Sequence, residues 1–279
     1  MKIIYALALL FIFISCSEIQ IESEPKTITS ADTHIVITEF QTILDTTYLT
    51  GSILVYDVEE ETYYSNDFEW AKVGQLPAST FKIPNSIIAL ETGIVKSDST
   101  LFKWDGEKRA NKIWEQDLLF KEAFHYSCVP CYQEIAREIG YERMNTYSEL
   151  YNYGTIKVDS ITIDKFWLEG DSKVSQFQQI KFLKRFYTSR LSISESTEDI
   201  MKRMMIIEEN AKYTLSGKTG WSFYNQKDNG WFVGYIETKE KVYFFATNIE
   251  PTEKFNLNRF PRIRKAVTYE ALKQMNIIN

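Results

Sequence analysis

Strand-like sequence at both ends of the chain, separated by helix-like sequence, constrains the fold most. Apolar and polar residues alternate over residues 51–67, GSILVYDVEEETYYSND, which predicts a β-hairpin. The alternation returns over residues 212–250, in KYTLSGKTGW and GWFVGYIETKEKVYFFATNIE. Strands at both ends with helices between them favour one shared sheet. We therefore predict an α+β fold of the sandwich type: an antiparallel sheet built from both chain ends, flanked by helices, with a helical lobe inserted over about residues 77–204.

Apolar residues recur at spacings of three and four in the segments that we predict to be helical. These segments are residues 83–93 (IPNSIIALETG), 114–127 (WEQDLLFKEAFHYS), 130–147 (PCYQEIAREIGYERMNTY), 174–191 (VSQFQQIKFLKRFYTSRL) and 259–275 (RFPRIRKAVTYEALKQM). A further helix is predicted over residues 34–49, and Pro130 suits the first turn of the segment that it opens. No internal repeat is visible, so residues 34–279 are predicted to form one domain.

Charge and composition exclude some classes of partner. With 279 residues, of which 44% are hydrophobic, the chain is long enough to bury a large core, and disorder is not expected. The net charge is −6, and no stripe of Lys and Arg is interleaved with aromatic residues. We therefore expect no nucleic-acid partner.

The first residues, MKIIYALALLFIFISCSE, predict export. An apolar run over residues 3–14 follows a single lysine and is too short for a convincing membrane span, so residues 1–16 are predicted to be a signal peptide. Ser15 before Cys16 also resembles a lipoprotein cleavage box, in which Cys16 carries a lipid anchor. A soluble periplasmic protein and a membrane-anchored lipoprotein both remain open, and the polar residues 17–33 are expected to be a flexible segment.

Cys128 and Cys131 form a C-x-x-C motif within SCVPC. A redox motif is one interpretation, but the βαβ pattern that accompanies such motifs is missing. The favoured interpretation is two packed thiols or one short-range disulfide. The two histidines, His34 and His125, give no recognisable zinc spacing with these cysteines, so no metal is expected.

Ser79 and Lys82, in ASTFKIPNS, have the spacing of a nucleophile and its base. Residues three apart lie on one face of a helix, so both side chains can reach one space. No G-x-S-x-G motif is present, which leaves a Ser-His-Asp site with little support. A lysine base must be neutral, and burial in the apolar surroundings of Lys82 would lower its pKa. A neutral amine can also add carbon dioxide and become a carbamate.

Two later stretches strengthen this single weak match. Ser127-Cys128-Val129 offers a second hydroxyl at the start of a predicted helix. Lys218-Thr219-Gly220 offers a cation, a hydroxyl and a glycine without a side chain on a predicted strand. Taken singly, Ser127 could be a helix cap. The order of all three motifs in one chain is what favours a catalytic site.

These motifs resemble those of the class D, or oxacillinase-type, β-lactamases among the serine penicillin-recognising enzymes. The matching stretches are Ser79-Thr80-Phe81-Lys82, Ser127-Cys128-Val129, Lys218-Thr219-Gly220, Phe166-Trp167-Leu168-Glu169-Gly170 and Gly230-Trp231-Phe232-Val233-Gly234-Tyr235. The S-x-V form of the second motif distinguishes class D from classes with S-D-N, Y-x-N or S-x-N. Two positions depart from the family: Tyr153-Gly154-Thr155 replaces Tyr-Gly-Asn, which affects the local loop and the substrate profile, and Cys131 replaces a valine, which we interpret as a packing change.

The resemblance implies hydrolysis of β-lactam antibiotics through a serine acyl-enzyme. Ser79 would attack the lactam carbonyl, and Lys82, as N6-carboxylysine formed from carbon dioxide or bicarbonate, would be the base in acylation and deacylation. Trp167 would hold the carbamate, while Val129 lines its pocket. Ser127 and Lys218 would relay a proton to the departing lactam nitrogen.

The resemblance also implies a binding site for the tetrahedral oxyanion and the substrate carboxylate. The backbone N–H groups of Ser79 and Trp221 would bind the oxyanion. The substrate-binding residues would be Val129, Thr219, Gly220, Trp221 and Arg264, with Arg264 gripping the carboxylate together with Thr219 and Lys218.

Two alternatives keep the same motifs. One is a β-lactam sensor domain, which holds the acyl group, and the other is a cell-wall transpeptidase or carboxypeptidase; both would acylate without fast release. The sensor hypothesis is weakened because such receptors are much longer. The transpeptidase hypothesis is weakened because Val129 and Trp167 favour carbamate chemistry.

Overall fold

The computed structural model describes residues 32–278. The predicted signal segment, Cys16 and residues 17–31 lie outside the described residues. Within the described part of the chain, no helix has the length and apolar character needed to cross a membrane.

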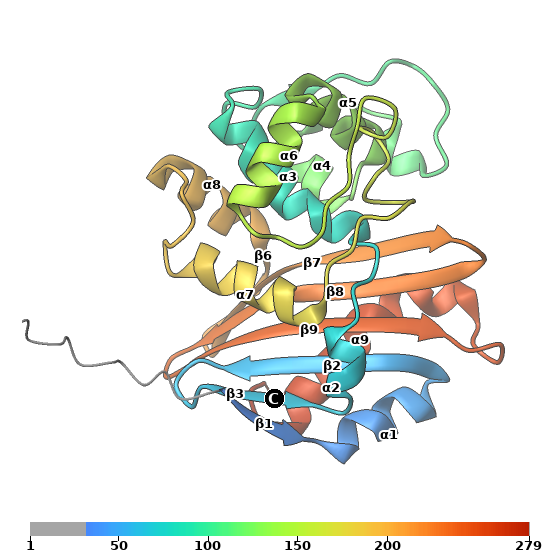
Figure 1. Ribbon diagram of the computed structural model, residues 1–279, viewed down its shortest axis with the longest axis vertical. Coiled ribbons are helices and arrows are strands. Elements are labelled where there is room, and N and C mark those ends of the chain that lie inside the picture. Colours follow the sequence, from blue (N-terminus) through green and yellow to red (C-terminus); the bar gives the residue numbers. More distant parts are fainter. Residues whose placement is uncertain (1–31, 279) are drawn as a thin grey trace, which may run out of the picture. The chain divides into compact units, whose positions relative to one another are not determined.

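A seven-stranded sheet in the order β1-β3-β2-β9-β8-β7-β6 forms the centre of the described fold (Figure 1). The strands are β1 (Thr33–Val36), β2 (Leu49–Asp57), β3 (Thr62–Ser65), β6 (Ile206–Glu209), β7 (Tyr213–Tyr224), β8 (Lys227–Thr238) and β9 (Val242–Pro251). Neighbouring strands pair antiparallel except β1 and β3, which are parallel. The predicted α+β fold with a sheet from both chain ends is confirmed, with the difference that the sheet is mixed.

The N-terminal end of the fold corrects the prediction of one helix over residues 34–49. Thr33–Val36 is strand β1, which pairs with β3 from Thr33↔Thr62 to Val36↔Ser65, and the helix α1 is confined to Thr38–Thr46. The short THIV sequence becomes a strand because β3 supplies its hydrogen-bond partners.

Helices occupy most of the chain between β3 and β6, and a helix closes it. They are α2 (Phe68–Lys72), η1 (Ala78–Phe81), α3 (Lys82–Glu91), η2 (Lys112–Trp114), α4 (Phe120–His125), α5 (Val129–Ile139), α6 (Tyr141–Leu150), α7 (Gln176–Tyr187), α8 (Glu195–Met205), η3 (Leu257–Arg259) and α9 (Phe260–Gln274). The short strands β4 (Leu101–Phe102) and β5 (Leu118–Leu119) pair with each other, so much of the predicted helix over residues 114–127 is not helical. The segment 130–147 divides into α5 and α6 at Gly140, whose φ of 77° cannot continue a helix.

Alternating residues of the central strands separate two cores. Ile53 and Val55 on β2 face one core with helices α1 and α9, while Leu54 and Tyr56 face the other core with the helices from α3 to α8. This period of two is what a sheet covered on both faces requires. In Figure 1, α7 lies across the sheet and α3 to α6 gather beyond its β7 side.

Candidate active site

Ser79 lies on a buried turn that packs against strand β7. The turn is the 3₁₀ helix η1, and Ala78, with a φ of 49°, has the left-handed conformation that residues other than glycine rarely adopt. The Ala78 N–H donates to the Trp167 carbonyl oxygen at 2.8 Å, which fixes this conformation. On β7, Gly220 approaches so closely that a Cβ there would lie 3.2 Å from the Cβ of Ala78. The glycine of the third motif therefore allows the strand to reach the serine turn.

Lys82, the first residue of α3, is buried without a hydrogen-bond partner among the described residues. The side chain is 1% exposed, and its Nζ lies 4.4 Å from the ring centroid of Tyr132 and 5.8 Å from that of Trp167. Burial lowers the pKa of Lys82 to about 7, so much of the amine is neutral at neutral pH. The indole N–H of Trp167 is also buried and has no acceptor in the described part of the chain. These two donors would both be satisfied by an acceptor placed between them.

Ser127 and Lys218 form the second polar pair of the site. Lys218 Nζ donates to Ser127 Oγ at 2.5 Å and to the Thr219 carbonyl oxygen at 3.2 Å. Ser127 itself has a φ of 52°, and Val129, two residues later, begins α5 and is half-buried. Burial lowers the pKa of Lys218, and the positive charge of Lys82 lowers it further, because the two lysines share one site.

Arg264 reaches the same strand from α9, on the other side of the sheet. Its guanidinium donates to the carbonyl oxygens of Gly220 at 2.6 Å and Pro261 at 3.1 Å and lies 5.9 Å from the ring of Trp221. Burial lowers the pKa of Arg264 to about 10, which leaves it charged at neutral pH. Trp221 is 38% exposed, so the arginine and an open aromatic surface lie together beside the third motif.

Tyr132, which no sequence motif singled out, forms a wall of the lysine pocket. Its ring covers Lys82 Nζ, and its hydroxyl lies 2.6 Å from Ser86 Oγ. Burial raises the pKa of Tyr132, so the phenol stays neutral. The available signal was helical spacing, since Val129 and Tyr132 are three residues apart and share a face of α5.

A buried polar network, which the sequence did not predict, holds the turn that carries Ser79. Thr80 Oγ1 donates to the Pro77 carbonyl oxygen at 2.6 Å, accepts from Gln179 Nε2 at 2.9 Å and lies 3.2 Å from the Tyr153 hydroxyl. The network joins η1 to α7 and to the loop after α6. No sequence motif links these residues, so only the fold reveals them.

The unusual triplet Tyr153-Gly154-Thr155 divides into buried and exposed parts. Tyr153 belongs to the network beneath η1, whereas Thr155 is exposed and pairs through its backbone with Lys173 in both directions at 2.8 Å. A Cβ on Gly154 would lie 2.6 Å from the Lys173 carbonyl oxygen, which explains the glycine. The departure from the family at Thr155 therefore changes an exposed side chain.

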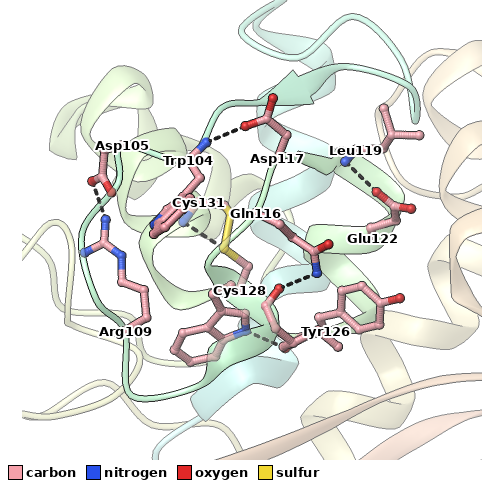
Figure 2. The surroundings of a disulfide bond; sticks show 12 residues. Trp104, Asp105, Arg109, Gln116, Asp117, Leu119, Glu122, Tyr126, Cys128 and Cys131 are labelled. Atoms are coloured by element: carbon pink, nitrogen blue, oxygen red, sulfur yellow. Dashed lines mark hydrogen bonds and ion pairs between the residues drawn. A yellow bond between two sulfur atoms is a disulfide. The ribbon is translucent and has the colours of Figure 1, made fainter.

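Cys128 and Cys131 form a disulfide at the start of α5 (Figure 2). The short-range disulfide among the sequence interpretations is thus the observed one, and the interpretation of Cys131 as a packing change is wrong, because Cys131 is covalently bonded. Among residues 32–278, no group of three or more His, Cys, Asp or Glu side chains could hold a metal ion.

The chain is similar to proteins that are named as β-lactamases. The family model described as penicillin binding protein transpeptidase domain matches residues 50–272. Beta-lactamase OXA-48 from Klebsiella pneumoniae is 39% identical over 82% of this chain and 84% of its own length, and Beta-lactamase OXA-10 from Pseudomonas aeruginosa is 41% identical over 77% of this chain and 80% of its own length. The crystal structure of class D beta-lactamase from Sebaldella termitidis superposes with a TM-score of 0.83 at 38% identity, covering 89% of this chain and 100% of that one.

These matches agree with the geometry, since Lys218 of the third motif donates to Ser127 of the second, and Gly220 of the third packs against the turn that carries Ser79. They extend over most of this chain and of its relatives. The chain belongs to the class D β-lactamases, serine enzymes that hydrolyse β-lactams, within the penicillin-binding transpeptidase domain family.

Proposed function

We propose that this β-lactamase works through a Ser79 acyl-enzyme, with carboxylated Lys82 as the base for both half-reactions. The observation that carries the proposal is that two buried donors of the lysine pocket, Lys82 Nζ and Trp167 Nε1, have no acceptor among residues 32–278. Burial without partners costs free energy unless something in the working enzyme satisfies these atoms.

A carboxylate on Lys82 fits these residues. The neutral amine attacks carbon dioxide, forms an N–C bond and releases one proton, which requires the lowered pKa that burial produces. Trp167 can only donate through its indole N–H, so it suits an anionic acceptor and not a cationic amine. The Tyr132 ring lies over the amine, and Val129, one turn earlier on α5, would line the same pocket with an apolar side chain. When present on Lys82, the carboxylate would supply a base as strong as an ordinary carboxylate, at the end of a long side chain.

In acylation, Ser79 loses its proton to that base while its Oγ bonds to the lactam carbonyl carbon. The backbone N–H groups of Ser79 and Trp221 would bind the resulting oxyanion. Cleavage of the C–N bond leaves a nitrogen that needs a proton. Ser127 can give its hydroxyl proton and take one back from Lys218, since their polar atoms are 2.5 Å apart. In deacylation the base, after passing on the first proton, takes a proton from water as the water oxygen bonds to the acyl carbon. It then returns this proton to Ser79 Oγ as the ester bond breaks, which regenerates the serine.

The carboxylate that β-lactams carry would bind beside Thr219, Lys218 and Arg264. Three of the five guanidinium N–H groups of Arg264 already donate to backbone carbonyl oxygens, including that of Gly220. The remaining donors and the full charge are available to an anion.

Multiple-turnover hydrolysis of a chromogenic cephalosporin, with and without added bicarbonate, tests the mechanism. Sustained turnover that bicarbonate increases is the expected result, and Ser79→Ala should remove it. A burst equal to the enzyme concentration, with no turnover afterwards, would contradict the proposal and favour a sensor domain or a cell-wall transpeptidase.

We also propose that the protein is exported, with residues 1–16 as the signal. Two forms are considered: a lipoprotein anchored through Cys16 and a soluble periplasmic protein. The support is the apolar run before Ser15-Cys16. Metabolic labelling with a fatty acid should mark the parent and not a Cys16→Ser variant. Unlabelled protein that begins after Cys16 in the periplasm would show a soluble enzyme instead.

A further inference from the structure

The turn at residues 127–132 contacts both buried lysines of the site. Ser127 Oγ accepts a hydrogen bond from Lys218, and the ring of Tyr132 lies 4.4 Å from Lys82 Nζ. One short segment therefore sets the surroundings of the proposed base and those of the proposed proton relay. Any change in the shape of this turn would move the two contacts relative to each other.

The disulfide closes this turn. It joins Cys128, which directly follows Ser127, to Cys131, which directly precedes Tyr132, with the Cα atoms 5.5 Å apart. Cys128 Sγ also accepts a hydrogen bond from the Cys131 N–H at 3.2 Å and so caps α5. A covalent bond and a cap thus constrain the same turn.

Ser127 needs such a constraint, because its φ of 52° is one that a serine rarely adopts. On its N-terminal side, the Ser127 N–H donates to the Phe124 carbonyl oxygen at 3.1 Å, and the Cys128 N–H donates to that of Ala123 at 2.9 Å. These bonds fix the turn to the end of α4. On the C-terminal side, the disulfide fixes it to α5.

We propose that the Cys128–Cys131 disulfide is a positioning element of the β-lactamase reaction, which holds Ser127 on Lys218 while Tyr132 stays over Lys82. The inference rests on the proposed function. It predicts that breaking the crosslink slows acylation, since Ser127 is then free to relax to an ordinary backbone conformation and leave its partner.

The disulfide can be broken without a mutation. Cys128 and Cys131 line a surface cavity of about 230 Å³ together with Trp104, Trp114 and Arg137, and Figure 2 shows Trp104 beside the disulfide. A small dithiol that enters this cavity can attack one sulfur, displace the other and leave as a cyclic disulfide. Two electrons pass from the dithiol to the protein, which then carries two thiols.

Two double variants separate the crosslink from the cap. Cys128→Ala/Cys131→Val loses both, whereas Cys128→Ser/Cys131→Val loses the crosslink but keeps a side-chain acceptor for the cap. Valine is the residue that class D enzymes usually carry at position 131, so both variants should fold. We expect both to acylate with a fluorescent penicillin about tenfold more slowly than the oxidised parent. The dithiol-reduced parent should behave like them and recover on reoxidation.

Ile139→Val provides the matched control, because Ile139 is buried but lies at the opposite end of α5 from the turn that carries the disulfide. It should lower thermal stability and leave acylation unchanged. The pH profile of acylation is a second readout that general destabilisation would not move. We expect its midpoint to shift by more than about 0.5 units in the uncrosslinked proteins, because Lys218 loses its hydroxyl partner.

Three results would overturn the inference. If Cys128→Ser/Cys131→Val matches the parent while Cys128→Ala/Cys131→Val is slow, the cap and not the crosslink positions the turn. If all proteins acylate alike, the disulfide has no role in the reaction. If the oxidised parent itself does not acylate, the proposed function fails and this inference fails with it, an outcome recognised by the missing burst in the parent.

Discussion

Lys82 and Lys218 are two buried lysines of one site, and their surroundings differ. Lys82 is enclosed by the rings of Tyr132 and Trp167 and has no hydrogen-bond partner in residues 32–278. Lys218 donates to Ser127 and to the Thr219 carbonyl oxygen. Burial is the largest cause of a lowered pKa in both lysines.

The difference shows how one residue type supports two kinds of chemistry. An amine without partners is easily neutralised and is available to form a covalent bond to carbon dioxide. An amine that donates to a hydroxyl is already placed for proton transfer. The functions we propose for these lysines follow from their partners and not from burial, which they share.

The largest expected effect comes from removing the amine of Lys82. Lys82→Ala should lower turnover by at least about 10³-fold, because one base serves both half-reactions. Steady-state hydrolysis measures the loss, and thermal unfolding should show an intact fold. Turnover at the parent rate would exclude Lys82 as the base.

Ser127→Ala tests the partner of the second lysine. We expect acylation to slow by about 10²-fold, since the proton route to the lactam nitrogen is interrupted. The bicarbonate concentration for half-maximal activity should not change, because the Lys82 pocket is untouched. Stopped-flow acylation at several bicarbonate concentrations measures both quantities, and a changed bicarbonate requirement would mean that the two lysines do not act separately.

Trp167→Phe keeps an aromatic ring and removes only the unpaired indole N–H. Without added bicarbonate, hydrolysis should fall by about tenfold, and excess bicarbonate should restore much of it, because a lost hydrogen bond weakens the carbamate. Carbon-13 NMR with labelled bicarbonate should show a weaker carbamate signal. Trp231→Phe is the matched control, since the Trp231 indole is equally buried but donates to the Leu76 carbonyl oxygen at 2.8 Å. Equal bicarbonate responses in both variants would contradict a specific role for Trp167.

Sequence patterns predicted a sheet built from both chain ends, and they identified the three motifs, because strand alternation and short motifs are both visible in short stretches of sequence. Alternation in β7 and β8 appears in the sequence, and so does the order of Ser79, Ser127 and Lys218. The remaining features depend on contacts between distant segments. Strand β1 exists because β3 pairs with it, and η1 is held by side chains from α7 and the loop after α6.

The lack of a hydrogen-bond partner for Lys82 among residues 32–278 could not be predicted either, for the same physical reason. A lysine in an apolar sequence can be solvated, paired or enclosed, and the choice depends on which rings fold over it. Tyr132 and Trp167 come from α5 and from the loop before α7. The disulfide was one of two favoured interpretations of C-x-x-C, beside a redox motif, because only the turn geometry brings the two sulfur atoms together.

The smallest expected effect concerns stability. In buffer free of carbon dioxide, folded Lys82 has a pKa of about 7, against 10.5 for an unperturbed lysine. Between these values the unfolded chain binds more protons, so stability rises with pH across that window. Lys82→Met should therefore be more stable than the parent near pH 7 by upwards of about 1 kcal/mol, and the gain should shrink towards pH 10.5. Denaturant unfolding at several pH values measures it.

Lys218→Met completes the comparison in the same experiment. Its pKa is also lowered by burial, but removing this amine sacrifices the hydrogen bonds to Ser127 and the Thr219 carbonyl oxygen. Each such bond contributes about 1 kcal/mol, so the gain should be smaller than for Lys82→Met. If both variants gain equally, or if the Lys82→Met gain does not depend on pH, hydrogen bonding does not distinguish the two lysines and burial alone controls them.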